Sequence, residues 1–535
     1  MNALVLILIS IIAFSIAYVT YGAWLTKQWG VDDAIATPAH TRADGVDYVP
    51  ASAPVLLGHH FASIAGAGPI TGPIAAAVFG WVPVLLWIII GSIFIGGVQD
   101  YSSIFASIRH EGKSIGEVIH VNMGTKGKKL FAVFAWLTLL LVVAAFTNIV
   151  ANTFVSVPAA ASASMMFIVL AIVFGYAVYR KGASLTVGTV IGVALLIACI
   201  ALGNLFPLVM SRNAWIVFLL VYIFIASTTP VWILLQPRDY LNSFLLYAMI
   251  AGAVLGLLIY RPNIELTPYA GFVVNGQFLF PILFITIACG AISGFHSLVG
   301  SGTTAKQLDR EKDAKLVGYG GMLIEGVLAT IAIITAAYVT GPRLGELLAN
   351  GGPVNVFSDG IGVFMTSFGI PFEIGKSFVA LAVSAFALTS LDTATRLGRF
   401  ILQEFFEPED ATAPKPFFTN MYAATGVTVV FGGLLAITSW QQIWPIFGSA
   451  NQLLAALALM SVAVWLKKQG KNNKMFTIPI VFMFAATLLA LVLLARQNLI
   501  AGNMILVAFP VVLFILAIIL LVQGFGILFK AEAKE

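Results

Sequence analysis

Apolar and polar stretches alternate along the whole chain, and the apolar stretches are about as long as a membrane is thick. A helix of about 20 apolar residues crosses about 30 Å of hydrocarbon. The longest polar stretches, 25–53 and 340–372, are too short for a soluble core and are predicted to be loops. The apolar runs predict about 15 transmembrane helices, at 2–24, 58–79, 82–106, 129–150, 158–179, 184–203, 214–234, 240–260, 281–300, 316–339, 375–401, 417–439, 443–466, 475–495 and 503–528.

Composition supports an all-α polytopic membrane protein. Of 535 residues, 60% are hydrophobic and 10% are charged, whereas soluble proteins have about 25% charged residues. The excess positive charge lies on short loops between spans, so membrane topology explains it better than nucleic-acid binding does. Cys199 and Cys289 fall in separate predicted helices and have no metal-ligand companions at short spacing.

The distribution of Lys and Arg predicts the orientation. With the N-terminus outside, 23 of the 28 basic residues fall on the inner side and 5 on the outer side. This predicts an odd number of spans and a cytoplasmic C-terminus. The first span, 2–24, has no basic start or cleavage site and is interpreted as retained. We expect one membrane domain, with a peripheral first helix and loop at 1–57, a transport core at 58–466 and accessory helices at 467–535.

Two spans are predicted to be broken. The second carries three glycines and two prolines within residues 66–73, and the ninth has a Gly- and Ser-rich stretch over 289–304. Close helix packing through small residues is one interpretation. The other is an inverted-repeat transporter, because the two spans are seven apart and cross in opposite directions. In such proteins half-helix N-termini attract anionic substrates, and freed carbonyls coordinate a cation.

Small and polar residues beside the two breaks are the predicted substrate-binding site. Adjacent histidines such as His59 and His60 point to different faces of a helix, so a metal or haem site is disfavoured. The half-helix ends would bind a carboxylate, and nearby side chains would shape the pocket. The predicted substrate-binding residues are His60, Ser63, Gly66, Ala67, Gly68, Gly290, Ser293, Gly294 and His296.

Acidic residues inside apolar spans are candidates for ion coupling, because a buried charge there needs a partner or a proton. Glu325 is either a protonatable coupling site or a neutral acid hydrogen-bonded to backbone. Asp392 either pairs with Arg396, four residues on, or helps to bind Na⁺. Asp100 is expected to pair with Arg109. The ion-coupling candidates are Thr389, Ser390, Asp392, Thr393 and Glu325, with Na⁺ possible at Thr389, Ser390 and Thr393.

Five segments, in order, resemble the carbon starvation protein A family of prokaryotic inner-membrane transporters. They are 59–70, 97–100, 291–304, 386–396 and 444–456. At position 99 this chain has Gln where His is usual in the family. The resemblance implies a LeuT-like fold, as in transporters of the amino acid–polyamine–cation type, and uptake of peptides or pyruvate during nutrient limitation. Spans two, nine and eleven would then be core helices one, six and eight. The standard core separates the first two by five spans rather than seven, so either two helices are inserted or the count is high by two.

The combined expectation is a cation-coupled importer, using H⁺ or Na⁺, of a small carboxylate such as pyruvate or short peptides. It would lie in the inner membrane of a prokaryote, with a small-molecule substrate, a coupling ion and lipid as partners. No cofactor, catalytic residue or nucleic acid is expected. A passive channel and a membrane-embedded redox or enzyme subunit are the alternatives. The first would need a polar ring along several spans, and the second a catalytic dyad or a haem clamp.

Overall fold

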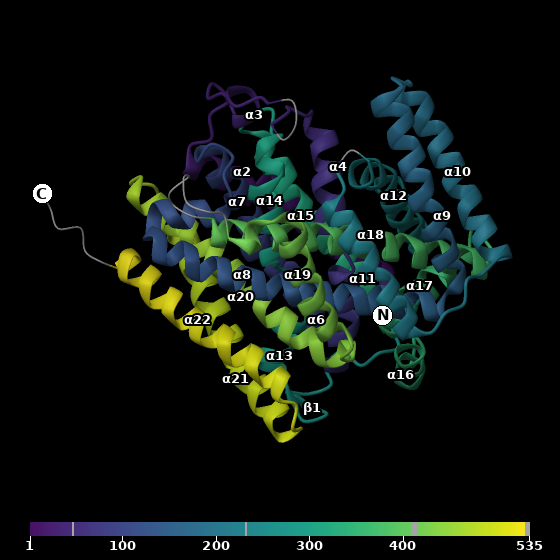
Figure 1. Cartoon of the computed structure of the whole chain (residues 1–535). Helices are drawn as coiled ribbons and strands as arrows, with labels where there is room; N and C mark the ends of the chain where they lie inside the picture. Colours follow the sequence, from purple (N-terminus) through teal and green to yellow (C-terminus); the bar gives the residue numbers. More distant parts are fainter. Residues whose placement is uncertain (45–47, 231–232, 408–415, 530–535) are drawn as a thin grey trace, which may run out of the picture.

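The chain folds into a bundle of helices, shown in Figure 1. The computed structural model describes residues 1–44, 48–230, 233–407 and 416–529. Within these residues the strands are β1 (Val273–Val274) and β2 (Gln277–Phe278), which form one antiparallel hairpin. The α-helices are α1 (Ala3–Val19), α2 (Tyr21–Trp29), α3 (Pro38–Thr41), α4 (Ala53–Ile64), α5 (Gly68–Ala76), α6 (Trp81–Gly91), α7 (Gly97–Arg109), α8 (Ile115–Ser156), α9 (Pro158–Gly175), α10 (Leu185–Leu205), α11 (Arg212–Thr228), α12 (Leu235–Tyr260), α13 (Leu279–Thr286), α14 (Gly294–Gly302), α15 (Gly321–Ala337), α16 (Gly341–Ala349), α17 (Gly352–Thr366), α18 (Phe372–Phe406), α19 (Met421–Ala436), α20 (Trp440–Lys468), α21 (Thr477–Ile500) and α22 (Met504–Phe529).

Each predicted span overlaps a helix or a pair of helices, but the predicted number is not confirmed. In the part of the chain that the structure describes, 11 helices are long and apolar enough to cross a membrane, or up to 12 if the bent pair α4–α5 is one span. Helices α11 and α19 are apolar but shorter, and the ninth predicted span is divided into α13 and α14. The protein is therefore a multi-pass helical membrane protein. Its orientation and its three-part division remain predictions.

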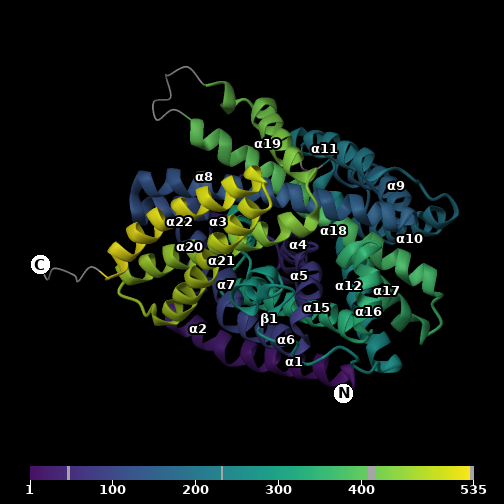
Figure 2. The same cartoon turned by 90° about the horizontal axis from the view of Figure 1, so that it is seen from below.

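The longest helices form the centre of the bundle. Helix α8, whose 42 residues are interrupted by a kink at Gly124, packs along α18, with 35 residues, and α20 packs against α8. Residues 446–466 of α20 are all buried, as expected for a helix that is apolar on every side. In both views α21 and α22 lie at one edge of the bundle, and α9 and α10 lie at the opposite edge (Figure 2).

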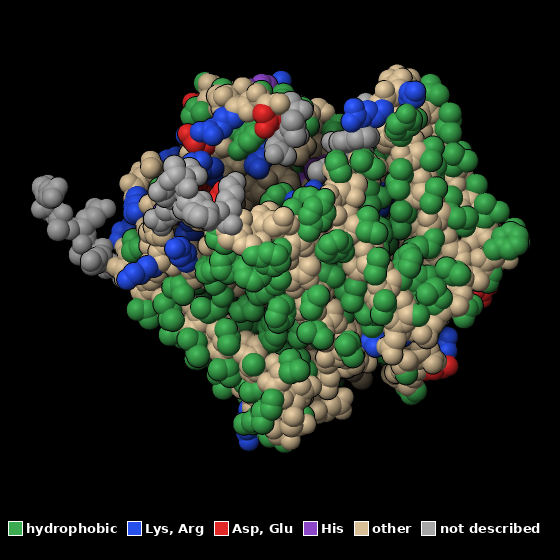
Figure 3. All heavy atoms as spheres, in the orientation of Figure 1, with side chains coloured by type: hydrophobic (Ala, Val, Ile, Leu, Met, Phe, Trp, Pro, Cys, Tyr) green, Lys and Arg blue, Asp and Glu red, His purple; other side chains and the backbone are tan. Residues whose placement is uncertain are grey.

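The outer helices turn apolar side chains away from the protein. Val190 on α10 and Val522 on α22 are each 67% exposed. Figure 3 shows hydrophobic side chains spread over the middle of one face, with Lys and Arg near its margins. Large continuous apolar surfaces are rare on proteins in water. This surface suits contact with lipid, which needs no hydrogen bonds from side chains.

The predicted loop at 340–372 is wrong, because it contains the helices α16 and α17. Helix α17 lies against α12, α15 and α18 and is buried along most of its length. Its polar side chains are bonded inside the protein, as when Asn355 donates to the carbonyl of Leu347 at 3.0 Å. A helix of 15 residues containing Asn355, Ser358 and Asp359 is too short and too polar to be found by a search for apolar runs.

Candidate functional site

Two interruptions in helices lie in the interior of the bundle. Helix α4 ends at Ile64 and α5 begins at Gly68, with a bend of 48° between them. Helix α13 ends at Thr286 and α14 begins at Gly294. Pro69 occupies the first turn of α5, where the missing N–H costs no helical hydrogen bond. Both predicted breaks are therefore present.

The two breaks lie against each other through their glycines. A Cβ atom added to Gly68 would overlap the side chain of Cys289, and one on Gly290 would lie 2.8 Å from the Ala329 methyl and 3.5 Å from Pro69. These glycines allow the close packing that was one of the two sequence-based interpretations. The structure thus brings Gly68 and Gly290 together, while their role in substrate binding remains a prediction.

Side chains satisfy several backbone carbonyls that the second break frees. The indole N–H of Trp444 donates to the carbonyl of Thr286 at 3.0 Å, and the Ser92 hydroxyl donates to that of Gly290 at 3.3 Å. A buried carbonyl without a partner would be costly, so these bonds stabilise the unwound segment. Because these carbonyls already accept hydrogen bonds, they are less available to coordinate a cation.

Asn451 on α20 caps the start of α14. Its side-chain oxygen accepts from the N–H of Phe295 at 2.9 Å, and its amide nitrogen donates to the Ser293 hydroxyl at 3.1 Å. A Cβ on Gly294 would overlap the backbone of α20, so the two helices touch there. The N-terminus of α14, predicted to attract a substrate carboxylate, already has an oxygen atom from the protein.

The side chain of His296 lies between two carboxylates. Its Nδ1 atom is 2.8 Å from Oδ2 of Asp100 on α7, and its Nε2 atom is 3.3 Å from Oε2 of Glu325 on α15. All three side chains are fully buried. Two buried carboxylates beside one imidazole cannot all be charged at low cost, so the cluster favours binding of protons. Glu325, a candidate for ion coupling, therefore has a titratable partner from another helix.

Gln99 links this cluster to the second break. With its amide oriented to satisfy its neighbours, Gln99 donates to Asp100 Oδ1 at 2.7 Å and to the carbonyl of Ser293 at 3.0 Å. Its oxygen accepts from the N–H of Ser297 at 3.2 Å. The neutral amide thus holds Asp100 in place beside His296 without adding a charge.

The predicted pair between Asp100 and Arg109 is wrong. Arg109 instead pairs with the buried Glu311 at 2.5 Å, while Asp100 faces His296. The two residues of the predicted pair are nine positions apart on α7. Residues at that spacing lie more than two turns apart and do not meet on a helix, whereas those three or four apart do.

His60 and Ser63 are on α4, just before the first break. The Nδ1 atom of His60 is 2.8 Å from the hydroxyl of Thr304, and its buried Nε2 atom has no hydrogen-bond partner among the described residues. Ser63 donates to the carbonyl of His59 at 2.9 Å, within its own helix. His60 therefore retains a free polar atom, and Ser63 does not need another partner.

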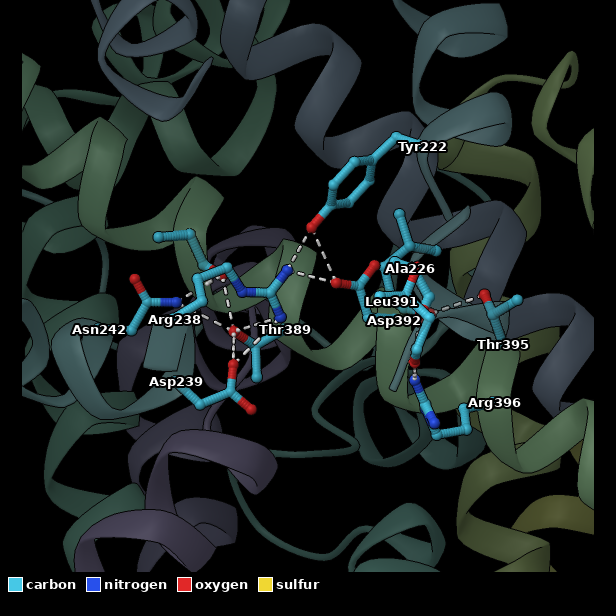
Figure 4. A network of polar contacts seen from close by, with 12 residues as sticks. Tyr222, Ala226, Arg238, Asp239, Asn242, Thr389, Leu391, Asp392, Thr395 and Arg396 are labelled. Carbon is cyan, nitrogen blue, oxygen red and sulfur yellow. Dashed lines mark hydrogen bonds and ion pairs between the residues drawn. The ribbon is translucent and has the colours of Figure 1, made fainter. Parts of the chain in front are cut away.

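A guanidinium lies where sodium was predicted (Figure 4). Arg238 on α12 pairs with Asp392 through Nη1, and its Nη2 atom is 3.1 Å from Asp239 and 3.3 Å from the Thr389 hydroxyl. The hydroxyl of Tyr222 accepts from Arg238 at 2.5 Å and donates to Asp392 at 3.0 Å. Of the residues considered for Na⁺ binding, Thr389 and Asp392 are thus engaged by a cation of the protein itself, whereas Ser390 and Thr393 have no such contact among the described residues.

The predicted pair between Asp392 and Arg396 is also wrong. Arg396 donates to the carbonyls of Ala226 at 2.8 Å and of Thr229 at 2.7 Å, at the end of α11. Asp392 turns toward Arg238 instead (Figure 4). A buried carboxylate gains more from a fully enclosed guanidinium than from one that also has free carbonyls to satisfy.

The remaining predicted ion-coupling residues lie on the same part of α18. A Cβ on Gly66 would overlap the Ser390 hydroxyl, so this serine borders the first break. The buried Ser390 hydroxyl has no hydrogen-bond partner among the described residues. Thr393 is half-buried. The structure therefore places Ser390 at the first break, and Thr389 and Asp392 near it along α18.

The sequence interpretation missed Arg238, Asp239, Tyr222 and Asn242 as members of this network. Arg238 was counted among the residues between spans, but α12 begins at Leu235 and buries it. A basic and an acidic residue side by side, directly before an apolar run, was the available signal. Asn242 donates to the Thr389 hydroxyl at 3.1 Å, a contact that no spacing along the chain would reveal.

Comparisons with known proteins agree with a transporter. The family model described as carbon starvation protein CstA matches residues 2–347 and 341–490. The peptide transporter CstA of Bacillus subtilis is 32% identical, covering 100% of this chain and 97% of the relative. The peptide transporter CstA of Helicobacter pylori is 34% identical, covering 91% of this chain and 81% of the relative. The pyruvate/proton symporter BtsT of Escherichia coli is 31% identical, covering 92% of this chain and 81% of the relative.

A solved structure shows a similar fold. The manganese transporter of Eremococcus coleocola, in complex with an aromatic bis-isothiourea compound, superposes with a TM-score of 0.54 over 91% of this chain and 99% of that one. The identity is 12%, so the likeness concerns the fold and not the cargo. The expected LeuT-like core remains a prediction.

Proposed function

Because this chain belongs to the carbon starvation protein CstA family, we propose that it is a secondary active importer that couples proton movement to the uptake of pyruvate or short peptides. Two kinds of relative support this: several named as peptide transporters and one named as a pyruvate/proton symporter. Identity is at a similar level to both kinds, so the proposal keeps both substrates. The protein acts as a transporter rather than an enzyme.

The observation that carries the proposal is the buried cluster of His296, Asp100 and Glu325. A coupling site needs groups that bind and release protons and that lie next to the part of the protein that moves. His296 is in the first turn of α14, directly after the second break, and Glu325 and Asp100 come from two other helices. A change at the break would alter the distances from His296 to Asp100 and to Glu325, and with them the affinity of these three side chains for protons.

The substrate carboxylate is proposed to bind at the first break. Asn451 already caps α14, whereas Ala67, the N-cap residue of α5, makes no side-chain cap bond. The positive end of α5 near Gly68 therefore remains for an anionic group. His60, with its free Nε2 atom, is the proposed neutral donor to the same substrate.

Uptake into proteoliposomes tests the proposal. Purified protein is reconstituted in sodium-free buffer, and a pH gradient with the alkaline side inside is imposed. We expect labelled pyruvate, a labelled dipeptide, or both to accumulate above the outside concentration and to leak out when a protonophore is added. If neither accumulates under pH or Na⁺ gradients while the protein is folded, the proposed function is refuted. Accumulation driven by Na⁺ alone would refute the choice of ion.

A further inference from the structure

Arg238 is a buried cation beside Thr389, one of the residues at which the sequence predicts sodium binding. We propose that its guanidinium replaces Na⁺ at a cation site formed by α12 and α18 beside the first break. The site therefore rejects Na⁺ in the native protein and accepts it when the guanidinium is removed. The role of this exclusion in transport rests on the proposed proton-coupled function, but the binding statement does not.

The guanidinium uses the oxygens that a hard cation would need. Arg238 contacts carboxylate oxygens of Asp392 and Asp239 and the hydroxyls of Thr389 and Tyr222. Its side chain is 1% exposed and that of Asp392 is 0% exposed. Carboxylate and hydroxyl oxygens are the ligands that hard cations prefer. While Arg238 is in place, those oxygens are occupied, and its charge repels a second cation.

Three further acceptor atoms on α12 and α18 have no hydrogen-bond partner among the described residues. They are the second carboxylate oxygen of Asp392, the side-chain oxygen of Asn242 and the hydroxyl of Ser390, all buried among the described residues. Ser390 also borders Gly66 at the break. A buried acceptor without a donor is costly. The site therefore has more oxygens than the guanidinium satisfies, as expected of a shell suited to a coordinated ion.

Arginine is suited to a permanent role here. Its guanidinium stays charged at every physiological pH, unlike histidine, and keeps its charge on burial more firmly than lysine does. It cannot leave the site as sodium does, and it does not release a proton to drive transport. Arg238 therefore holds α12 and α18 together with a constant charge, and the ion that moves is handled elsewhere, at His296.

The test measures sodium binding through stability. The melting temperature of the purified full chain is compared in NaCl and in choline chloride at equal ionic strength. The wild type and Arg238→Lys should melt at the same temperature in both salts. Arg238→Ala should melt higher in NaCl, by on the order of 2 °C or more when Na⁺ is in large excess. Adding Asp392→Asn to Arg238→Ala should abolish the difference.

Arg399→Ala is the matched control. It also removes a buried guanidinium from this region, but Arg399 donates to the carbonyl of Ser227 and pairs with no carboxylate among the described residues. It should show no preference for NaCl. A folded Arg238→Ala variant without a sodium-specific shift would overturn the inference, as would sodium stabilisation of the wild type.

A wild-type measurement decides the case even where Arg238→Ala does not fold. Uptake by the native protein should be equally fast in sodium and in choline buffers at a fixed pH gradient, and a sodium requirement overturns the inference. Failure of all uptake would refute the proposed function instead. The stability experiment is independent of uptake, so the two failures are distinguishable.

Discussion

Replacing Glu325 by glutamine is expected to separate substrate movement from proton movement. The change keeps the shape of the side chain and removes its charge and its titratable proton. Glu325 is fully buried, and its one charged contact among the described residues is His296, at 3.3 Å. The substrate would still exchange across the membrane, but a pH gradient would no longer concentrate it.

The size of the effect follows from the distance. Two unit charges 3.3 Å apart attract by about 5 kcal/mol at an effective dielectric constant of about 20. A gradient of two pH units supplies about 2.7 kcal/mol per proton, which sustains about hundredfold accumulation at one proton per substrate molecule. The lost interaction exceeds the driving force. The variant should therefore lose coupling altogether, with equal concentrations inside and outside.

The assay compares two measurements on the same proteoliposomes. Accumulation is measured under a gradient of about two pH units, and counterflow of labelled substrate is measured without a gradient. Glu325→Gln should fail the first and retain the second. Glu346→Gln, which alters an exposed carboxylate that pairs with Arg343 on α16, should retain both. Accumulation by Glu325→Gln to the wild-type level would refute the reasoning.

Asn451→Ala removes the cap at the buried start of α14 and leaves the N–H of Phe295 without its acceptor. It should lower the melting temperature further than Asn420→Ala, which removes the cap at the exposed start of α19 and should cost about 1 kcal/mol of stability. An equal loss of stability in the two variants would contradict the importance of this buried cap. Arg109→Gln should destabilise the fold by about 2 kcal/mol. Breaking a fully buried ion pair costs about 3–5 kcal/mol, and the cost is smaller here because Arg109 is 24% exposed. Two double-mutant cycles read by thermal unfolding test this pairing. The stability losses of Arg109→Gln and Glu311→Gln should not add, because the two residues contact each other, whereas those of Arg109→Gln and Asp100→Asn should add. The opposite result would restore the pairing expected from sequence.

The parts of the fold that sequence predicted are those set by local chemistry. Long apolar runs located the membrane helices, because crossing hydrocarbon fixes their length and composition. The breaks were predictable because Gly and Pro cluster there, and Glu325 was noticeable as an acid within an apolar run. Helix α17 was missed because its polar groups are satisfied by tertiary contacts, which leave no periodic signal along the chain.

Partner choice was the part that sequence could not supply. Nearby charges were paired by spacing, as for Asp392 with Arg396, but the structure pairs Asp392 with Arg238, 154 residues away. His296 and Asp100 are 196 residues apart. Within a membrane protein each buried charge takes its partner from whichever helix lies beside it, and the fold decides which helix that is. Sequence thus located residues beside the breaks but not most of their contacts, and the roles of these residues in transport stay predictions.

The side-chain bonds around the second break make the two broken helices mechanically unequal. Helix α20 bonds both halves of the second one, through Trp444 to the carbonyl of Thr286 before the break and through Asn451 to the N–H of Phe295 after it. Among the described residues no helix forms side-chain hydrogen bonds to both halves of the first one, although α15 packs against both α4 and α5. The second broken helix should therefore swing with α20 as a single lever, and the first should bend at its own hinge between Ile64 and Gly68.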